Sequence, residues 1–362
     1  MRLEKAFDRK FFGYRSILGW NHWRKHVKKI LFGKGNRGIG DRLWCVRNGF
    51  DLSDLNLFGA ENLKANKKDY LSARDYLKLH PINGEYSFWI DDKLTMKNVF
   101  SRYEEYLPAY YFQLEKNRIM RLVNCPEELD ASVDGILALL RDKKLLAVKR
   151  LWGSGGAGFY RLEYGENGYL VNRKATGEEE LRRLLAGLHP YLVMEYVINH
   201  RAIREIWPDA TNTMRVLMAN CGGELVLLRS FIRFGNASSN CVDNAHAGGI
   251  ESVIDEETGK ILFTQAQDVY GTPTVITHHP DSGVSFDIWI PRWKEITEQI
   301  RKICLDYPQM RYMGFDVAVT EDSFKILEIN SLSGLMAAQC KEPLMKDPKT
   351  RRVFEYFKKT NR

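Results

Sequence analysis

The sequence predicts an α+β protein in which antiparallel sheets dominate. Residues 1–90 show helical patterns broken by Gly and Asn, with few strand signals. From residue 145 onward, short apolar runs alternate with glycine turns, which is typical of hairpins. Helix-rich and strand-rich segments therefore occupy different parts of the chain.

Two helices are expected ahead of the strand-rich part. Asp91 and Asp92 suit the N-cap of a helix over residues 93–106, which Pro108 would end. A second helix is expected over residues 127–143, because apolar side chains recur there at helical spacing, namely Val133, Ile136, Leu137 and Leu140.

The strand-rich part opens with an apolar run and a glycine loop over residues 153–158. Cys221, Gly222 and Gly223 form a hairpin turn signal, and Pro291 suits the first turn of a helix. Strands are predicted over residues 145–149, 159–164, 168–172, 191–197, 213–219, 225–234, 314–320 and 324–330, with helices over residues 178–188 and 291–305.

Composition indicates a folded protein with more than one core. The chain has 362 residues, of which 44% are hydrophobic and 12% aromatic, so two or three lobes are expected. No run of apolar residues is long enough to cross a membrane, and no signal peptide is visible. The six cysteines are scattered without a C-x-x-C pair, which predicts free thiols and a cytoplasmic location.

The net charge of +8 comes from 54 Lys and Arg against 46 Asp and Glu, and the excess is uneven. Basic residues are frequent between Arg15 and Arg47, where Trp20, Trp23 and Trp44 also lie, and again over residues 346–362. A solvated helix face is the first interpretation, and peripheral docking on an anionic membrane is the alternative. The three tryptophans, if exposed, would suit an interface with a partner.

The strongest local signal is a set of oxygen ligands on the last two strands. Glu328 and Asn330 lie two residues apart, so they share one face of a strand, and Asp316 can stand beside them across the hairpin. Clustered carboxylates repel each other unless a cation is present, and hard oxygen ligands suit Mg²⁺. Ordinary polar residues at the end of a strand are an equally good interpretation of this segment alone.

The glycine loop at residues 153–158 follows a predicted strand that carries Lys149. Its backbone N–H groups can approach phosphates closely. The loop lacks the P-loop pattern, and a strand rather than a helix follows it, which excludes a Rossmann fingerprint. Most glycine-rich turns are only turns.

Two further segments carry weaker signals. Lys93 and Lys97 lie one helical turn apart, and a lysine at a helix start can reach a phosphate, although a solvated lysine face is the more common arrangement. Glu195 lies in an apolar strand over residues 193–197, whose backbone can pair with an adenine edge or form plain sheet.

In this order, the four segments resemble the ATP-grasp superfamily. The resemblance implies two α+β lobes that clasp ATP, over residues 91–197 and 198–340, with a mainly helical region over 1–90 and a basic helix over 341–362. It implies that Lys93 and Lys149 hold the α- and β-phosphates and that Asp316, Glu328 and Asn330 bind Mg²⁺. The implied lid comprises Gly153, Ser154, Gly155, Gly156 and Gly158, and the implied adenine hinge Glu195, Tyr196 and Val197.

A narrower resemblance, over roughly residues 91–334, is to the sugar-transfer-associated ATP-grasp subgroup, which is related to teichuronopeptide-type ligases. Residues 211–216, 241–250, 279–283 and 290–293 carry it. Arg215 would then be a catalytic cation beside Lys149, facing the transferred phosphate. The implied substrate loop contains Asp243, Asn244, His246, Gly248 and Gly249, although an Asx-turn explains Asp243 and Asn244 equally well. No acid follows the hinge before Glu205, so the ribose ligand is unassigned.

The resemblance implies an ATP- and Mg²⁺-dependent ligase that joins an acid to an amine through an acyl phosphate. The substrates would be small and sugar-linked, in the assembly of bacterial surface polysaccharide, with no nucleic acid expected. A kinase acting on a hydroxyl would keep the same fold. A basic, non-catalytic protein that binds anionic lipid or nucleic acid is a third interpretation, which leaves the Asp316, Glu328 and Asn330 arrangement without a purpose.

Overall fold

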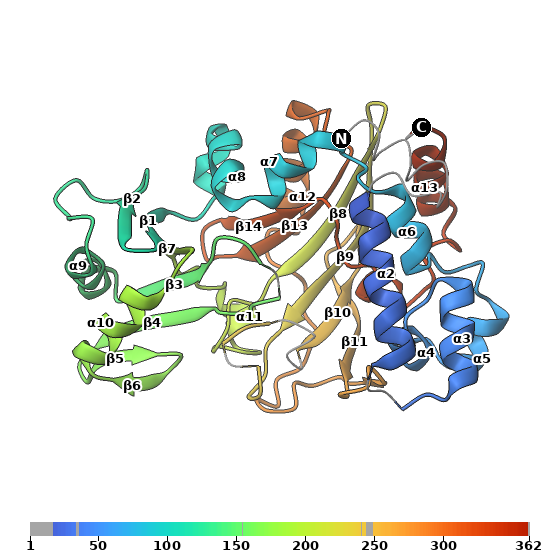
Figure 1. The fold of residues 1–362 in the computed structure, drawn as a ribbon, viewed down its shortest axis with the longest axis horizontal. Coiled ribbons are helices and arrows are strands. Elements are labelled where there is room, and N and C mark those ends of the chain that lie inside the picture. Colours follow the sequence, from blue (N-terminus) through green and yellow to red (C-terminus); the bar gives the residue numbers. More distant parts are fainter. Residues whose placement is uncertain (1–16, 34–35, 154, 240, 244–248, 361–362) are drawn as a thin grey trace.

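The computed structural model describes residues 17–33, 36–153, 155–239, 241–243 and 249–360. Two seven-stranded antiparallel sheets stand side by side, and a group of helices flanks the second sheet (Figure 1). The α+β class is therefore confirmed. None of the described helices combines the length and the apolar character needed to cross a membrane.

The first sheet has the strand order β2-β1-β7-β3-β4-β5-β6. Two helices, α9 (Val133–Lys143) and α10 (Glu178–Gly187), cover one face with Ile136, Leu140, Leu181 and Leu185. We call this unit the first lobe. Its strands are β1 (Tyr110–Glu115), β2 (Arg118–Arg121), β3 (Leu145–Arg150), β4 (Tyr160–Gly165), β5 (Gly168–Val171), β6 (Lys174–Thr176) and β7 (Tyr191–Glu195).

The second sheet has the order β12-β11-β10-β9-β8-β13-β14 and forms the second lobe. Helix α12 (Trp293–Asp306) packs its apolar stripe on one face, together with alternate strand residues such as Val216 and Phe315. Its strands are β8 (Met214–Cys221), β9 (Glu224–Phe234), β10 (Ile250–Ile254), β11 (Ile261–Gln267), β12 (Pro273–Val275), β13 (Tyr312–Val319) and β14 (Phe324–Asn330).

The opposite face of the second sheet is shared between helices and polar side chains. Helices α6 (Ala73–Leu79) and α13 (Pro348–Thr360) pack on one end of it, against residues such as Leu217 and Tyr312. Because side chains alternate along a strand, Arg215 and Asp316 point to this same face at the other end. This polar end lies nearest the first lobe.

The described part of the N-terminal region, from residue 17 onward, is helical. Helices α2 (Ile17–Phe32), α3 (Ile39–Asn48), α4 (Leu52–Leu57) and α5 (Ala60–Ala65) form a small core of their own. Trp23 is buried in that core, and Trp20 and Trp44 pack against it. The prediction of an exposed tryptophan surface is therefore wrong, because the aromatic stripe of α2 is the face that closes this core.

The segment between the helical region and the first lobe consists of short helices. These are η1 (Gly84–Ser87), α7 (Phe88–Asp91), α8 (Lys93–Val99) and η2 (Ser101–Tyr106). A single helix over 93–106 was predicted, but the helix breaks at Phe100, whose ring packs at 4.4 Å on Tyr307. Met96, Phe100 and Leu107 join the core of the second lobe, while Leu94 packs against the first lobe, so this segment contacts both lobes.

Other predicted boundaries shift for local reasons. Helix α9 starts at Val133 instead of residue 127, because the Ser132 hydroxyl accepts the Gly135 N–H and caps it. Helix α12 starts at Trp293, which leaves Pro291 outside it. Strand β7 ends at Glu195, two residues early. Strands β1, β2, β6, β10, β11 and β12 were not predicted, and two further one-turn helices are α11 (Arg201–Arg204) and η4 (Ala337–Gln339).

A buried carboxyl in the helical region makes stability depend on pH. Asp54 accepts the Asp51 N–H at 2.8 Å in a capping box, and its burial, together with the charge of Asp51, raises the pKa of Asp54 to about 7. The folded state therefore holds an extra proton between the ordinary carboxyl pKa and about 7, so stability falls as pH rises through that window.

Asn at position 54 keeps the acceptor and removes the charge. We expect Asp54→Asn to stabilise the protein at about pH 8 by on the order of 2 kcal/mol and to have little effect at about pH 4. Urea unfolding at the two pH values measures this. An equal effect at both would show that Asp54 stays ionised in the folded protein.

Candidate active site

A cleft lies between the two sheets and has an apolar end and a charged end. It holds about 170 Å³ of space. The apolar end is lined by Ala147, Phe159, Met194 and Leu327, next to the hinge residues Glu195, Tyr196 and Val197. The charged end is lined by Lys93, Lys149, Arg233, Asp243, Asp316 and Glu328. One wall comes from the first lobe and the other from the second.

Two lysines converge on one carboxylate at the charged end. The Glu328 Oε1 atom lies 3.3 Å from the Lys93 Nζ and 3.4 Å from the Lys149 Nζ. Burial opposes ionisation of Glu328, but Lys149 and Lys93 outweigh it and hold the pKa of Glu328 below its ordinary value. Burial lowers the pKa of Lys149, and Glu328 opposes that shift. Residues distant in sequence are thus brought to one point.

Local structure fixes the position of Lys93. Asp92 caps α8 by accepting the Thr95 N–H at 2.8 Å, which makes Lys93 the first helical residue. The second carboxylate oxygen of Asp92 accepts the Trp152 indole N–H at 2.9 Å, so the cap also holds the start of the glycine loop. Lys97 points elsewhere, since its Nζ donates to the Pro108 carbonyl and pairs with Glu104.

The glycine loop connects β3 to β4 and reaches the second lobe. Gly153, Gly155, Gly156 and Gly158 all have positive φ, which favours glycine, and Ser154 lies outside the described residues. A Cβ atom on Gly156 would lie 2.9 Å from a methyl carbon of Val242. The loop therefore covers the cleft in close contact with residues of the opposite lobe.

The acidic side chain of the hinge is engaged within the first lobe, which leaves the hinge backbone to face the cleft. The Glu195 carboxylate accepts the Ala109 N–H at 2.9 Å, which ties the end of β7 to the start of β1. The Val197 carbonyl accepts the Thr211 hydroxyl at 2.7 Å. Of the predicted hinge residues, all three line the cleft.

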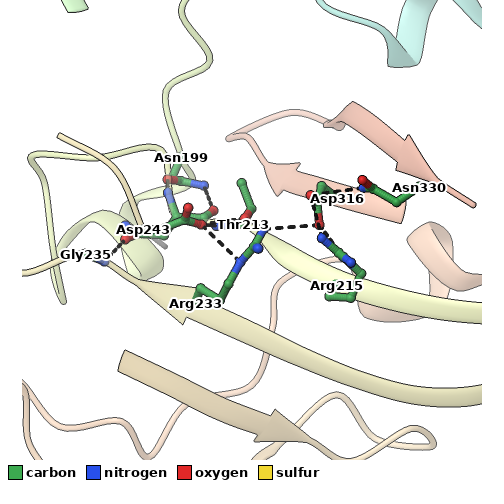
Figure 2. Close-up of polar contacts among 9 residues, drawn as sticks. Asn199, Thr213, Arg215, Arg233, Gly235, Asp243, Asp316 and Asn330 are labelled. Atoms are coloured by element: carbon green, nitrogen blue, oxygen red, sulfur yellow. Dashed lines mark hydrogen bonds and ion pairs between the residues drawn. The ribbon is translucent and has the colours of Figure 1, made fainter. Parts of the chain in front are cut away.

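Two arginines bind Asp316 (Figure 2). Arg215 forms a bidentate pair with Asp316, with Nε–Oδ1 and Nη2–Oδ2 distances of 2.5 and 2.9 Å. Arg233 approaches the same Oδ1 at 3.1 Å. Although burial opposes ionisation, Arg215 and then Arg233 hold the pKa of Asp316 below its ordinary value. Arg215 and Asp316 are both buried, so this is an internal ion pair.

The network continues from Arg233 to Asp243. Thr213 donates both its N–H, at 2.7 Å, and its hydroxyl to Asp243, and its hydroxyl oxygen accepts from Arg233. The Arg233 Nε lies 3.7 Å from Asp243. Burial raises the pKa of Asp243, and Arg233 opposes that shift. Two cations and two carboxylates thus alternate along one face of the second sheet.

The predicted metal ligands meet as the strand pairing required. Asp316 stands opposite Glu328 in the β13–β14 register, and Asn330 donates to Asp316 at 3.5 Å. Within the part of the chain that the structure describes, no three His, Cys, Asp or Glu side chains gather into a metal-binding group. The Asn330 side chain lies on the same strand face as Glu328, beside Asp316.

The structure changes the assignment of the predicted arginine. Arg215 was expected to face a phosphate, but its guanidinium group is paired with Asp316. Of the two arginines that bind Asp316, Arg233 is the one that lines the cleft. Arg233 was not predicted as a site residue, although it lies in the predicted strand over 225–234, two residues beyond Phe231, the cross-strand partner of Arg215.

The predicted substrate loop is only partly described. Asp243 lines the cleft and accepts the Thr213 N–H, which links it to the start of β8. Gly249 is buried just before β10. Asn244, His246 and Gly248 lie outside the described residues.

Each lobe is built on an antiparallel sheet, and the cleft between the lobes contains two lysines, a glycine loop and carboxylates. This arrangement defines an ATP-grasp protein. Within that class, the chain belongs to the sugar-transfer associated ATP-grasp family, whose sequence pattern it matches over residues 73–349. This match confirms the family resemblance on which the expectations for the site were based.

Several solved structures are similar to this chain. D-alanyl-alanine synthetase A from Vibrio cholerae shares 12% identity over 74% of this chain and 63% of its own, with a TM-score of 0.42. VanG D-Ala:D-Ser ligase from Enterococcus faecalis shares 11% over 74% and 60%, with a TM-score of 0.41. The macrocyclase MdnC from Microcystis aeruginosa shares 12% over 76% and 62%, with a TM-score of 0.39. The chain thus spans less than two thirds of the length of these three proteins. No curated protein matches it.

Proposed function

We propose that the protein is an ATP- and Mg²⁺-dependent ligase that joins a carboxylate to an amine through an acyl phosphate. The observation that supports this most directly is the meeting of Lys93 and Lys149 on Glu328 inside a cleft that is apolar at its other end. An apolar slot with a cationic end suits a nucleotide, whose base is flat and apolar and whose phosphates are anionic.

The proposed nucleotide position follows from the two ends of the cleft. The base would lie between Ala147, Met194 and Leu327, with its edge against the backbone of residues 195–197. Lys93 and Lys149 would turn from Glu328 to the phosphates, which lie within reach of the same ammonium groups. The glycine loop would close over the phosphates and keep water away.

The oxygen donors fit Mg²⁺. Glu328 and Asn330 are hard ligands on one strand face, and Asp316 lies opposite them. Both oxygens of Asp316 already accept from guanidinium groups, so Glu328 and Asn330 have more room for a cation. When bound, Mg²⁺ would neutralise phosphate charge and polarise the transferred phosphoryl group.

The proposed reaction needs positioning more than a protein nucleophile. A substrate carboxylate oxygen attacks the γ-phosphorus and ADP leaves. The amine then attacks the acyl carbon, and phosphate leaves to give an amide. Arg233 lines the cleft and would face the anionic group, while Arg215, fixed against Asp316, would hold that carboxylate and so orient Arg233.

The family association with sugar transfer supports a sugar-linked acid or amine as substrate. We therefore place the reaction in the assembly of a bacterial surface polysaccharide precursor, in the cytoplasm. Arg233, Asp243 and Asp316, which line the cleft beside the phosphate end, would contact the polar substrate.

Nucleotide binding is tested by thermal shift on Lys149→Met. ATP with Mg²⁺ should raise the melting temperature of the unmodified protein, because a ligand that binds only the folded state stabilises it. Removing the ammonium group should remove most of that shift. Lys97→Met, one turn from Lys93 but outside the cleft, is the control for loss of a buried lysine. An equal shift in Lys149→Met would contradict the proposed phosphate position.

The reaction type is tested by the products formed from ATP. With uronic acids or amino acids as the acid and hydroxylamine as the amine, a ligase releases ADP and orthophosphate and forms a hydroxamate. A kinase instead releases ADP alone and leaves a stable phosphorylated product. Detection of that product would overturn the ligase proposal and favour the kinase.

A further inference from the structure

Large apolar side chains are exposed together at one end of the molecule, away from the cleft. They are Phe32 at the end of α2, Ile39 and Leu43 on the exposed stripe of α3, and Val269 and Tyr270 in the turn between β11 and β12. Val269 is 92% exposed and Phe32 81%, and the other three expose at least half of their surface. We call these five residues the apolar rim.

Hydrogen bonds show that the two parts of the apolar rim are neighbours. Asn56 accepts from the Arg37 guanidinium at 2.7 Å and donates to the Tyr270 carbonyl at 2.6 Å. Arg37 lies in the connection between α2 and α3, so a single side chain bridges that connection and the β11–β12 turn.

The two tips of the apolar rim are rigidly held. Arg42 of α3 donates to the carbonyls of Ile30 and Gly33, which fixes the end of α2 against α3. In the β11–β12 turn, the Asp268 carboxylate accepts the N–H groups of Tyr270 and Thr272. The exposed apolar side chains are therefore presented on ordered backbone.

Basic side chains surround the apolar rim. Lys28 lies one helical turn before Phe32, and Lys25 and Lys29 are exposed on the same side of α2. Arg47 continues the exposed stripe of α3 beyond Leu43. The acidic side chains nearby are already engaged, since Asp41 pairs with Lys64 and Arg37, and Asp268 caps its own turn. The outward charge around the rim is positive.

We propose that the apolar rim docks the protein on an anionic lipid bilayer. Separate apolar side chains at the end of α2, on α3 and in the β11–β12 turn can enter the interface between headgroups and acyl chains, while lysines beside them meet the negative surface. A protein partner would be expected to use a larger, more continuous apolar face. This inference does not depend on the proposed ligase activity, because the rim contains none of the residues that line the cleft.

Vesicle sedimentation with Phe32→Ser/Val269→Ser tests the proposal. The unmodified protein should sediment with vesicles of phosphatidylcholine and phosphatidylglycerol and stay in solution with phosphatidylcholine alone. The double variant should bind the anionic vesicles at least about tenfold more weakly, since it withdraws two inserted side chains. Lys28→Gln/Lys29→Gln should also weaken binding by about tenfold, because each lysine contributes to electrostatic attraction.

A matched control is Val123→Ser, which removes a 71% exposed valine from the first lobe. It should bind vesicles like the unmodified protein. The rim variants should keep their thermal shift with ATP and Mg²⁺ if the nucleotide site is as proposed, and their unfolding curves check that they fold.

Three results would overturn the docking proposal. The unmodified protein could stay in solution with anionic vesicles, or the double variant could bind them as tightly as the unmodified protein. In the third, light scattering without lipid would show a dimer that Phe32→Ser/Val269→Ser dissociates, which would identify the rim as a contact between two copies.

Discussion

Replacing Glu328 by Gln is expected to abolish the stabilisation by ATP with Mg²⁺ and to lower the ligation rate by about 10²–10³-fold. The substitution keeps the shape of the side chain but removes the negative charge that Lys93 and Lys149 share. It also removes a carboxylate from the proposed cation site. Because the pKa of Glu328 is held below its ordinary value, the charge is present throughout the neutral range.

Thermal shift and steady-state rates with varied ATP measure the Glu328→Gln effect. The control is Glu355→Gln, which neutralises an exposed carboxylate on α13 and should change neither quantity. If Glu328→Gln keeps the full shift with ATP and Mg²⁺, Glu328 is not part of the cation site, and Asp316 becomes the carboxylate to examine.

Replacing Asp316 by Ala is expected to destabilise the protein by about 3–5 kcal/mol, because it leaves buried Arg215 without its counter-charge and removes a contact of Arg233. The pKa of Asp316 is lowered by the two arginines. Its stabilisation is therefore fully present above the ordinary carboxyl pKa and is lost as pH falls through the lowered value in the folded protein. Urea unfolding at neutral and acidic pH measures both effects.

A double-mutant cycle separates the ion pair from simple packing at Asp316. Arg215→Met combined with Asp316→Ala removes both charges, so the double variant should be more stable than the sum of the two single effects predicts. Strict additivity would show that Arg215 and Asp316 do not stabilise each other.

Much of the fold could be predicted because its central strands carry local signals. Glycine turns and apolar runs placed β8, β9, β13 and β14 to within two residues. Strands β1, β2, β6, β10, β11 and β12 were missed. Several of these lie at or near sheet edges, where pairing with a neighbouring strand, rather than local pattern, selects the extended conformation.

The site was predictable where strand geometry alone decides it. The spacing of two between Glu328 and Asn330, together with the hairpin, was sufficient to bring Asp316 beside them. The choice between Arg215 and Arg233 was not predictable. Both lie on one face, and only the three-dimensional position of Asp316 decides which guanidinium is fixed within the sheet and which lines the cleft.

In the basic N-terminal segment, the charge pattern predicted which side chains are exposed but not which are buried. Its charge run suggested an external helix face, and α2 does expose its lysines. Burial of Trp23 could not be read from the charges, because it depends on the partner helices that close the core. Among the α2 side chains that the structure describes, the exposed large apolar one is Phe32, at the end of the helix.

The sharing of Glu328 by Lys93 and Lys149 has a consequence for ligand affinity. In the proposed site, a cation that binds Glu328 would release the lysines for an anion, and an anion that binds the lysines would release Glu328 for a cation. Cation and anion would thus exchange partners through the same three side chains. By thermodynamic reciprocity each ligand must strengthen the other by the same factor. The site would in this way bind a nucleotide that carries its cation more tightly than a nucleotide without a cation, and no separate residue would be needed for this selectivity.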